Sequence, residues 1–354
     1  MIRLTWRQFR IQALVTFALL VVIAIVLAVT GPQLVHLYDT TIKPCKAQGD
    51  CSLASKVFLS HYRVLRDLGT VLVVVPALIG LFWGAPLVAR EFETGTFKLV
   101  WMQSTTRKRW LAVKLAVIGF VSVAFTGLLS LMVTWWSSPI DRVNAQPFGV
   151  FDQCDIVPLA YAAFAFALGV AAGVLLRRTI PAMVVTLVGF AGVRLAITTW
   201  VRPYLYAPLH FASALLLPSG NENANPPAGA LLRPGAWIIS DQTVNATGRV
   251  IGQQGAINFG GGHMGVGFNY TGVGKAVLQG VGLCPNKFPP QSAPVAVFER
   301  AAQTCVGKFN IREVLTYQPA SRYWAFQWSE AAIFIALALA LVGVSFWSLR
   351  RRFA

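Results

Sequence analysis

Six apolar stretches, each long enough to cross a bilayer, constrain this chain more than any other feature. A helix needs about 20 apolar residues to span the hydrocarbon core. Only 12% of the residues are charged, against about 25% in soluble domains, and a soluble core cannot hide so many consecutive apolar residues. We therefore predict an α-helical integral membrane protein with six transmembrane helices. The predicted spans are Ala13–Thr30, Leu68–Ala89, Leu111–Trp136, Ile156–Leu176, Pro181–Thr199 and Ser329–Trp347.

Lysine and arginine are concentrated in the short connections on one side of these spans. With the N-terminus taken as cytoplasmic, 14 basic and two acidic residues fall on the cytoplasmic side, against 15 basic and 11 acidic residues on the longer outer connections. Short cytoplasmic loops carry an excess of positive charge. We therefore predict that both chain ends are cytoplasmic and that residues 329–354 form the last span and a basic tail.

The first twelve residues are amphipathic, with Ile2, Trp6 and Phe9 on one helical face and arginines on a neighbouring face. This pattern predicts a connecting helix in the headgroup plane, leading into the first span. The alternative is an ordinary basic flank without a separate helix. A cleaved signal peptide is a further alternative for the first span, but Ala28-Val29-Thr30 is a poor cleavage site, which favours an uncleaved anchor.

Residues 200–328 are predicted to form an extracellular α+β segment before the last span. Trp237–Ile239 and Thr243-Val244 are short β-favouring runs beside turn residues. The stretch Gly248–Gly282 holds 12 glycines in 35 residues, which favours long loops. Phe298–Leu315 is more typical of a helix.

All five cysteines fall on the predicted outer side. Four cysteines allow three pairings, and the simplest pairs stay within one loop each, Cys45 with Cys51 and Cys284 with Cys305. Cys154 is then left over. An oxidising exterior favours disulfides over five reduced thiols.

The connection over residues 90–110 holds the only two acids on the cytoplasmic side, Glu91 and Glu93. Phe92, Thr96 and Leu99 recur at helical spacing, which predicts a short helix parallel to the membrane. Its acids would meet basic residues of a soluble partner. The alternative is a basic loop whose acids only balance Arg90.

Several stretches resemble the permeases of type-2 ATP-binding cassette (ABC) exporters, in particular a group common in actinobacteria. The Glu-x-Glu-x-Gly-Thr element is the most specific of them. The stretches are Gly84–Thr96, Trp101–Ser104 with Arg107, Trp110–Leu115, Leu168–Gly173 with Arg177-Arg178 and Pro181–Met183, Val193–Ala196 with Arg202-Pro203, and Tyr317–Trp324.

The resemblance implies a six-helix exporter permease in a bacterial plasma membrane, paired with a second permease copy, expected as a homodimer, and with two cytoplasmic ATPases. It places the coupling helix at about Glu91–Trp101. An amphiphilic substrate, such as a drug, lipid or peptide, is expected by analogy with the class. The expected ATPase-coupling residues are Arg90, Glu91, Phe92, Glu93, Gly95, Thr96 and Arg107.

The chain lacks the motifs that would let it power transport or catalyse a reaction. A phosphate-binding loop needs Ser or Thr after its Gly-Lys pair, and Gly274-Lys275 and Gly307-Lys308 are followed by Ala and Phe. We therefore expect no cofactor here, with ATP and Mg²⁺ on the partner ATPase. The histidines are scattered, so no metal site is predicted, and no basic stripe suits nucleic acid. The alternative function is a membrane-anchored extracellular binding or sensing protein.

Arg194 lies inside the fifth predicted span, where a charge is costly. One interpretation is that it snorkels to the outer headgroups. The other makes it a candidate residue of the translocation path, meeting substrate or a carboxylate such as Asp155 or Glu330.

Two small-residue motifs, Gly80-x-x-x-Gly84 and Gly169-x-x-x-Gly173, offer close-packing helix faces. Packing inside one copy is the favoured use of both, over packing between copies.

Overall fold

The computed structural model describes residues 2–48, 58, 73–96, 106–144, 147–214, 235–255 and 312–352. Within this part, six helical stretches are long and apolar enough to cross a membrane, which confirms the predicted fold class. They are Leu20–Cys45, Val75–Glu93, Arg107–Val143, Val157–Leu176, Thr179–Tyr204 and Ala320–Arg351.

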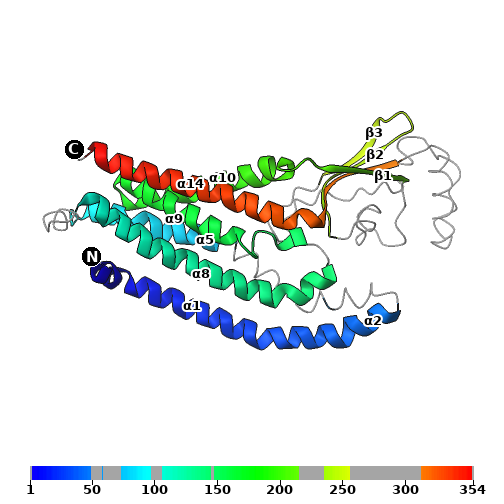
Figure 1. Cartoon of the computed structure of the whole chain (residues 1–354), viewed down its shortest axis with the longest axis horizontal. Coiled ribbons are helices and arrows are strands. Elements are labelled where there is room, and N and C mark those ends of the chain that lie inside the picture. Colours follow the sequence, from blue (N-terminus) through cyan, green and yellow to red (C-terminus); the bar gives the residue numbers. More distant parts are fainter. Residues whose placement is uncertain are drawn as a thin grey trace.

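The helices run side by side in an elongated bundle (Figure 1). Helix α1 (Ile2–Leu37) begins and helix α14 (Tyr323–Arg352) ends at the same end of the bundle, which we call the terminal end. A β-sheet lies beyond the opposite end, which we call the sheet end. Residues 2–12 are helical and form the first turns of α1. Their position in the headgroup plane stays a prediction.

The label η marks two kinds of short helical element. Three are π-helical turns inserted into the spans (η1, η2 and η4), and three are short 3₁₀ turns (η3, η5 and η6). The first span continues as η1 (Tyr38–Ile42) and α2 (Lys43–Gln48). The second consists of α5 (Val75–Ile79), η2 (Gly80–Gly84) and α6 (Ala85–Glu93). The others are α8 (Arg107–Asn144), the short η3 (Pro147–Val150), α9 (Val157–Leu176), α10 (Thr179–Ala196), η4 (Ile197–Val201), η5 (Arg202–Tyr204) and η6 (Ala320–Arg322).

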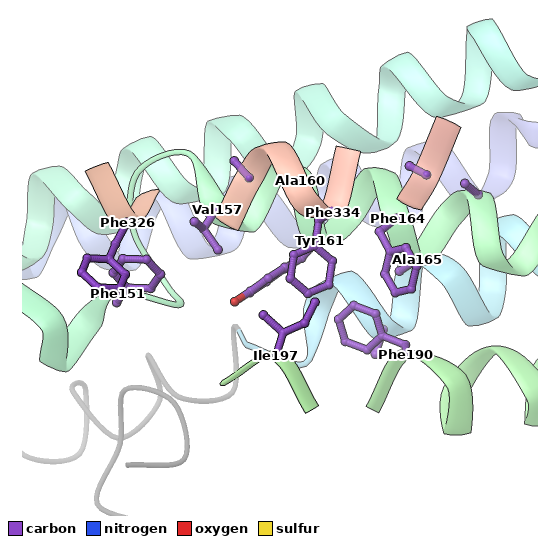
Figure 2. Packing of buried hydrophobic residues seen from close by; sticks show 14 of the residues in the cluster. Phe151, Val157, Ala160, Tyr161, Phe164, Ala165, Phe190, Ile197, Phe326 and Phe334 are labelled. Carbon is purple, nitrogen blue, oxygen red and sulfur yellow. The ribbon is translucent and has the colours of Figure 1, made fainter. Parts of the chain in front are cut away.

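Helix α9 is the most buried of the six spans, and α6, α8, α10 and α14 all pack against it. Its own aromatic residues and those of its neighbours interlock edge to face, as Figure 2 shows. The ring of Phe334 lies 4.7 Å from that of Tyr161 and 5.3 Å from that of Phe164, between centroids. This aromatic cluster joins α9 to α14, and Phe190 extends it to α10.

The two glycine motifs pack against each other inside the chain. A Cβ on Gly169 would lie within 3 Å of backbone atoms of Gly80, Gly84 and Ala85, and one on Gly80 would lie 2.6 Å from the carbonyl oxygen of Ala165. Only glycine lets the backbones of η2 and α9 approach this closely. The prediction that both motifs serve packing within one copy is therefore confirmed.

The sheet has four antiparallel strands in the order β1-β4-β2-β3. They are β1 (Leu209–Ala214), β2 (Trp237–Val244), β3 (Val250–Gly255) and β4 (Arg312–Gln318). The predicted β-runs at residues 237–239 and 243–244 are confirmed, because both lie in β2.

The helix predicted for Phe298–Leu315 is wrong where it is described. Arg312–Leu315 belong to β4, while residues 298–311 lie outside the described residues. The side chains of β4 alternate in burial from Arg312 to Tyr317, with Glu313, Leu315 and Tyr317 buried. This period of two fits a strand between β1 and β2.

Among the cysteines, Cys154 is free and buried. Burial, followed by the negative charge of Asp141, raises the pKa of its thiol to about 12. Cys45 is disulfide-bonded. Cys51, Cys284 and Cys305 lie outside the described residues, so both predicted pairings stay predictions.

The close helix contact predicts that Gly169→Ala destabilises the chain by about 1–3 kcal/mol, as overpacking does. The added methyl group would press on rigid backbone atoms rather than on a movable side chain. Gly192→Ala in α10 is the matched control, because nothing lies within 4 Å of a Cβ there. Unfolding by denaturant in detergent micelles measures both variants, and equal stabilities would contradict the packing.

Candidate functional site

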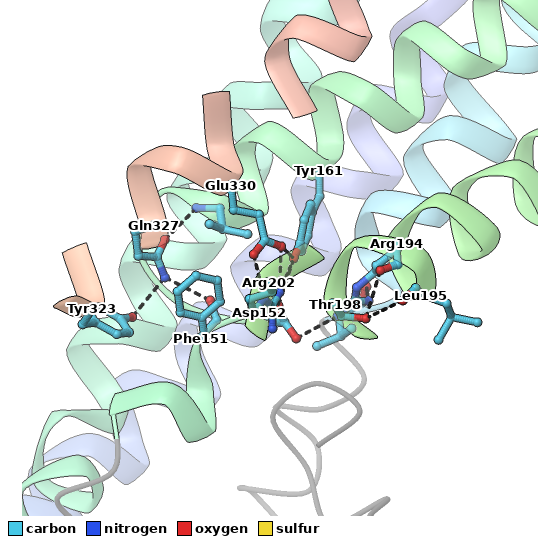
Figure 3. A network of polar contacts seen from close by, with 12 residues as sticks. Phe151, Asp152, Tyr161, Arg194, Leu195, Thr198, Arg202, Tyr323, Gln327 and Glu330 are labelled. Atoms are coloured by element: carbon cyan, nitrogen blue, oxygen red, sulfur yellow. Dashed lines mark hydrogen bonds and ion pairs between the residues drawn. The ribbon is translucent and has the colours of Figure 1, made fainter. Parts of the chain in front are cut away.

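Four charged residues and one tyrosine meet inside the sheet end of the bundle (Figure 3). Asp152 comes from the connection before α9, Tyr161 from α9, Arg194 from α10, Arg202 from η5 and Glu330 from α14. Asp152 and Glu330 have 2% and 1% of their surface exposed, so they require partners inside the protein. We call these five residues the ion cluster.

Arg202 lies at the centre of the ion cluster. Its guanidinium donates to both carboxylate oxygens of Glu330, from Nε at 2.6 Å and from Nη2 at 2.7 Å. The same Nη2 donates to Oδ1 of Asp152 at 2.5 Å. The planar fork of arginine suits such two-pronged contacts. The guanidinium also lies over the ring of Phe151, 4.5 Å from the ring centroid.

Tyr161 connects the two carboxylates from the side of α9. Its hydroxyl lies 2.6 Å from Oε1 of Glu330 and 2.9 Å from Oδ1 of Asp152. The cluster therefore brings together two negative and two positive side chains. Its net charge is zero, which lowers the cost of holding it away from water.

Arg194 is part of this cluster and meets a carboxylate different from those proposed for it. Its Nη2 lies 3.3 Å from Oδ2 of Asp152, and its Nη1 donates to the carbonyl oxygen of Val73 at 3.2 Å. Glu330 is taken by Arg202, and Asp155 accepts a hydrogen bond from the hydroxyl of Tyr323 instead. The side chain of Arg194 is 14% exposed, so it points into the protein rather than toward headgroups.

Asp152 is held in its charged form. Burial alone would raise the pKa of its carboxyl group. The charges of Arg202 and Arg194, with hydrogen bonds from Arg202 and Tyr161, outweigh burial and lower the pKa to about 2. The Asp152 carboxylate thus remains ionised at every physiological pH.

Gln327 of α14 supports the cluster from the neighbouring turn. Its side-chain oxygen accepts the backbone N–H of Val157 at 3.0 Å, and its Nε2 donates to the carbonyl oxygen of Phe151 at 3.1 Å. It therefore satisfies backbone groups on both sides of Asp152. Sequence reasoning missed Asp152, Tyr161 and Gln327 as site residues, because only their meeting in space marks them.

At the terminal end, Glu91 forms a buried ion pair with Lys114 of α8. The two charged atoms are 2.6 Å apart, and both residues are less than 10% exposed. Lys114 also donates to the carbonyl oxygen of Leu87 and lies over the ring of Trp110. This contact uses Glu91 within the chain, whereas the sequence-based hypothesis gave it to a partner.

Glu93 contacts the start of helix α10. Its Oε1 accepts the backbone N–H of Thr179 at 3.0 Å, and its Oε2 accepts the hydroxyl of the same residue. A carboxylate at a helix N-terminus is favourable for the helix dipole. Both acids of the connection therefore fasten α6 to a neighbouring helix.

Gly95 lies just beyond the end of α6, with a φ of +68° and open space around the position of a Cβ. This conformation ends the helix, and glycine adopts it without strain. Residues 97–105 lie outside the described residues, and they include the last five residues of the predicted coupling helix.

The other predicted coupling residues lie around this break. Arg90 accepts the backbone N–H of Thr94 at its carbonyl oxygen, and the Thr94 and Thr96 hydroxyls are 3.0 Å apart. Phe92 packs edge to face on Trp110, with Arg177 over its ring. Arg107 is exposed at the start of α8.

A family model described as ABC-2 membrane transporter related matches residues 17–202, more than half of the chain. The chain belongs to this family. Membership makes it a multi-pass membrane permease and implies a partner ABC ATPase. Searches among curated proteins and among solved structures found no match.

The family match ends at Arg202, so this ABC-2 permease completes its ion cluster with a residue outside the matched region, Glu330 of α14. Neither end of the bundle gathers three metal-ligating side chains among the described residues. The ion cluster thus joins the matched helices to the last span.

Asp152→Asn is predicted to cost about 3–5 kcal/mol of stability, because it leaves two buried arginines without their shared partner. Asp39→Asn is the control, since Asp39 forms an exposed pair with Lys43 and such pairs contribute about 0–1 kcal/mol.

The pH dependence follows from the lowered pKa of Asp152. A depressed pKa gives stability that is present above about pH 4 and lost as the pH falls toward 2. The stability difference between the native chain and Asp152→Asn should therefore be constant from pH 5 to 8. Denaturant unfolding across that range measures it, and a midpoint near neutrality would contradict the assignment.

Proposed function

We propose that the chain is the permease subunit of an ATP-driven exporter of the group common in actinobacteria. It acts as a homodimer with two cytoplasmic ATPases and moves an amphiphilic substrate out of the cell. The observation that carries the proposal is the family match, which covers the first five spans and the connection between α6 and α8.

In this proposal the terminal end is cytoplasmic and the sheet is extracellular. Arg107, Lys108 and Arg109 are exposed at the start of α8, and Arg350 and Arg351 are exposed at the end of α14. Positive charge at one end of the bundle supports this orientation.

The two acids of the connection act by positioning it. Glu91 is tied to α8 through Lys114, and Glu93 is tied to α10 through Thr179. A force from the ATPase on the segment between Gly95 and Arg107 would therefore reach α8 and α10 together. Direct contact with the ATPase falls to that segment, because Glu91 is buried in its own ion pair.

The apolar surface supports both a membrane setting and a second copy. Helix α1 packs mainly on α8, and its apolar side chains from Leu14 to Val29 are largely exposed. Helix α10 likewise exposes Ile180, Val184 and Val188. Lipid covers such faces in a single permease, and a second copy covers part of them in the dimer. The same apolar faces favour an amphiphilic substrate.

Arg194 stays the candidate residue of the translocation path in this proposal. It lies on α10 and is partly exposed beside an otherwise enclosed cluster. Its bond to Asp152 would then compete with an anionic group of the substrate.

The four-stranded sheet favours a second function, a membrane-anchored extracellular binding protein. Hydrolysis of ATP separates the two functions. An exporter permease forms a stable complex with its ATPase in nanodiscs and changes the ATPase rate, whereas a binding protein does neither.

Coupling through Glu93 predicts that Glu93→Ala lowers the ATP hydrolysis rate of the reconstituted complex severalfold, while the melting temperature changes little. The variant loses the link from the connection to α10, and its side chain is at the protein surface. Asp39→Ala removes an exposed acid at the sheet end and serves as the control. An unchanged rate in a complex that still assembles would rule out this role.

A further inference from the structure

Helix α10 continues beyond Ala196 as a single π-helical turn, η4. At its end the backbone N–H of Arg202 donates to the carbonyl oxygen of Ile197, five residues earlier. An α-helix would bond to the residue four positions earlier. A π turn therefore contains one extra residue, and such turns occur mostly singly, often at functional sites.

The extra residue decides which side chains share a face of the helix. Arg194 and Arg202 are eight residues apart, which in a regular α-helix would place them about 80° apart around the axis. With one residue absorbed by the π turn, they are spaced like residues seven apart, about 20° from one another. Both guanidinium groups consequently reach the same carboxylate, with Arg202 on Oδ1 and Arg194 on Oδ2 of Asp152.

Two threonines of η4 stabilise this turn through hydrogen bonds from their side chains to the helix backbone. The hydroxyl of Thr198 donates to the carbonyl oxygen of Arg194 at 2.9 Å, as Figure 3 shows. The hydroxyl of Thr199 donates to the carbonyl oxygen of Leu195 at 2.6 Å. A hydroxyl that donates to the carbonyl group four residues earlier competes with the α-helical backbone bond at that carbonyl, which favours the wider π turn.

The two arginines are held unequally. Arg202 has both oxygens of Glu330, one oxygen of Asp152 and the hydroxyl of Tyr161. Arg194 has a longer contact to Asp152, at 3.3 Å, and one backbone carbonyl. It is also the more exposed of the two, at 14% against 7%. The contact of Arg194 is therefore the one that breaks first.

We propose that η4 is a register switch at the sheet end of α10. As a π turn it holds Arg194 on Asp152. When the turn relaxes to α-helical geometry, α10 rotates by one residue step, about 100°, relative to Arg202, and Arg194 leaves Asp152. Arg202, Tyr161 and Glu330 stay together, so α10 moves while α9 and α14 keep their contacts. Arg194, Thr198 and Thr199 are the positioning residues of this movement.

An insertion cycle tests the switch on the full chain in lipid nanodiscs, with melting followed by fluorescence of its 11 tryptophans. In the native-length chain, Arg194→Gln should lower Tm by about 3 °C, as loss of a partly buried ion pair does. Insertion of one alanine after Thr199 adds a residue to η4, which turns Arg194 by about 100° away from the face that it shares with Arg202 and separates it from Asp152. In that background, Arg194→Gln should leave Tm unchanged.

Insertion of one alanine after Pro208 is the matched control, because it lengthens the chain beyond η5 without altering the spacing of Arg194 and Arg202. There the drop of about 3 °C on Arg194→Gln should persist. An equal drop in the chain with the alanine inserted in η4 would overturn the proposal, and so would the absence of a drop at native length.

A length-preserving variant decides the matter where the insertion prevents folding. Thr198→Val combined with Thr199→Val removes both hydroxyls and keeps the side-chain shape, which weakens the π turn. The effect of Arg194→Gln should then fall to less than half. Persistence of the full drop in this background would equally overturn the switch. Because every readout is thermal stability, failure of the switch is distinguishable from failure of the proposed transport function.

Discussion

Buried charges must neutralise one another, and the sheet end of this permease is arranged around that constraint. Asp152 and Glu330 are almost fully buried, and each would be costly without a positive partner. Arg202 forms an ion pair with both of them, and Arg194 pairs with the second oxygen of Asp152. Since these residues come from separate segments of the chain, the connection before α9, the end of α10 and the start of α14 are fixed together.

Apolar packing supplies the complementary constraint in the middle of the bundle. Hydrophobic burial gives helices little reason to associate within lipid, so close contact matters more there. The glycines of η2 and α9 provide this contact through backbone atoms, and Phe334 inserts between aromatic rings of α9. At the terminal end, Glu91 and Lys114 form a buried ion pair, in which each charge is neutralised by its partner as in the ion cluster. The bundle around helix α9 thus has an apolar centre and a buried ion pair or ion cluster toward each end.

Local pattern in the sequence was sufficient for the features that depend on local chemistry. The apolar runs predicted all six spans, and β-favouring residues predicted β2. The glycine spacing predicted packing within one copy. In contrast, Arg312–Leu315 were assigned to a helix because their strand pairing depends on β1 and β2, which are distant in the sequence.

The site was harder to predict, for the same reason. Arg194 was recognised as a costly charge, yet its partner Asp152 lies 42 positions earlier, and the π turn that directs both arginines leaves no simple sequence signal. Glu91 and Glu93 stood out by their charge, and their partners Lys114 and Thr179 became evident only from the packing of α6 on α8 and α10. Residue type identified these positions, and tertiary structure supplied their roles.

Hydrogen–deuterium exchange of Glu330→Gln tests most directly whether the ion cluster holds these segments together. The substitution keeps the shape of the side chain and removes one charge from α14. If the cluster unites the segments, amides of η4 and η5 and of residues 150–156 should exchange faster, although neither segment is near Glu330 in the sequence. Faster exchange confined to α14 would contradict the account.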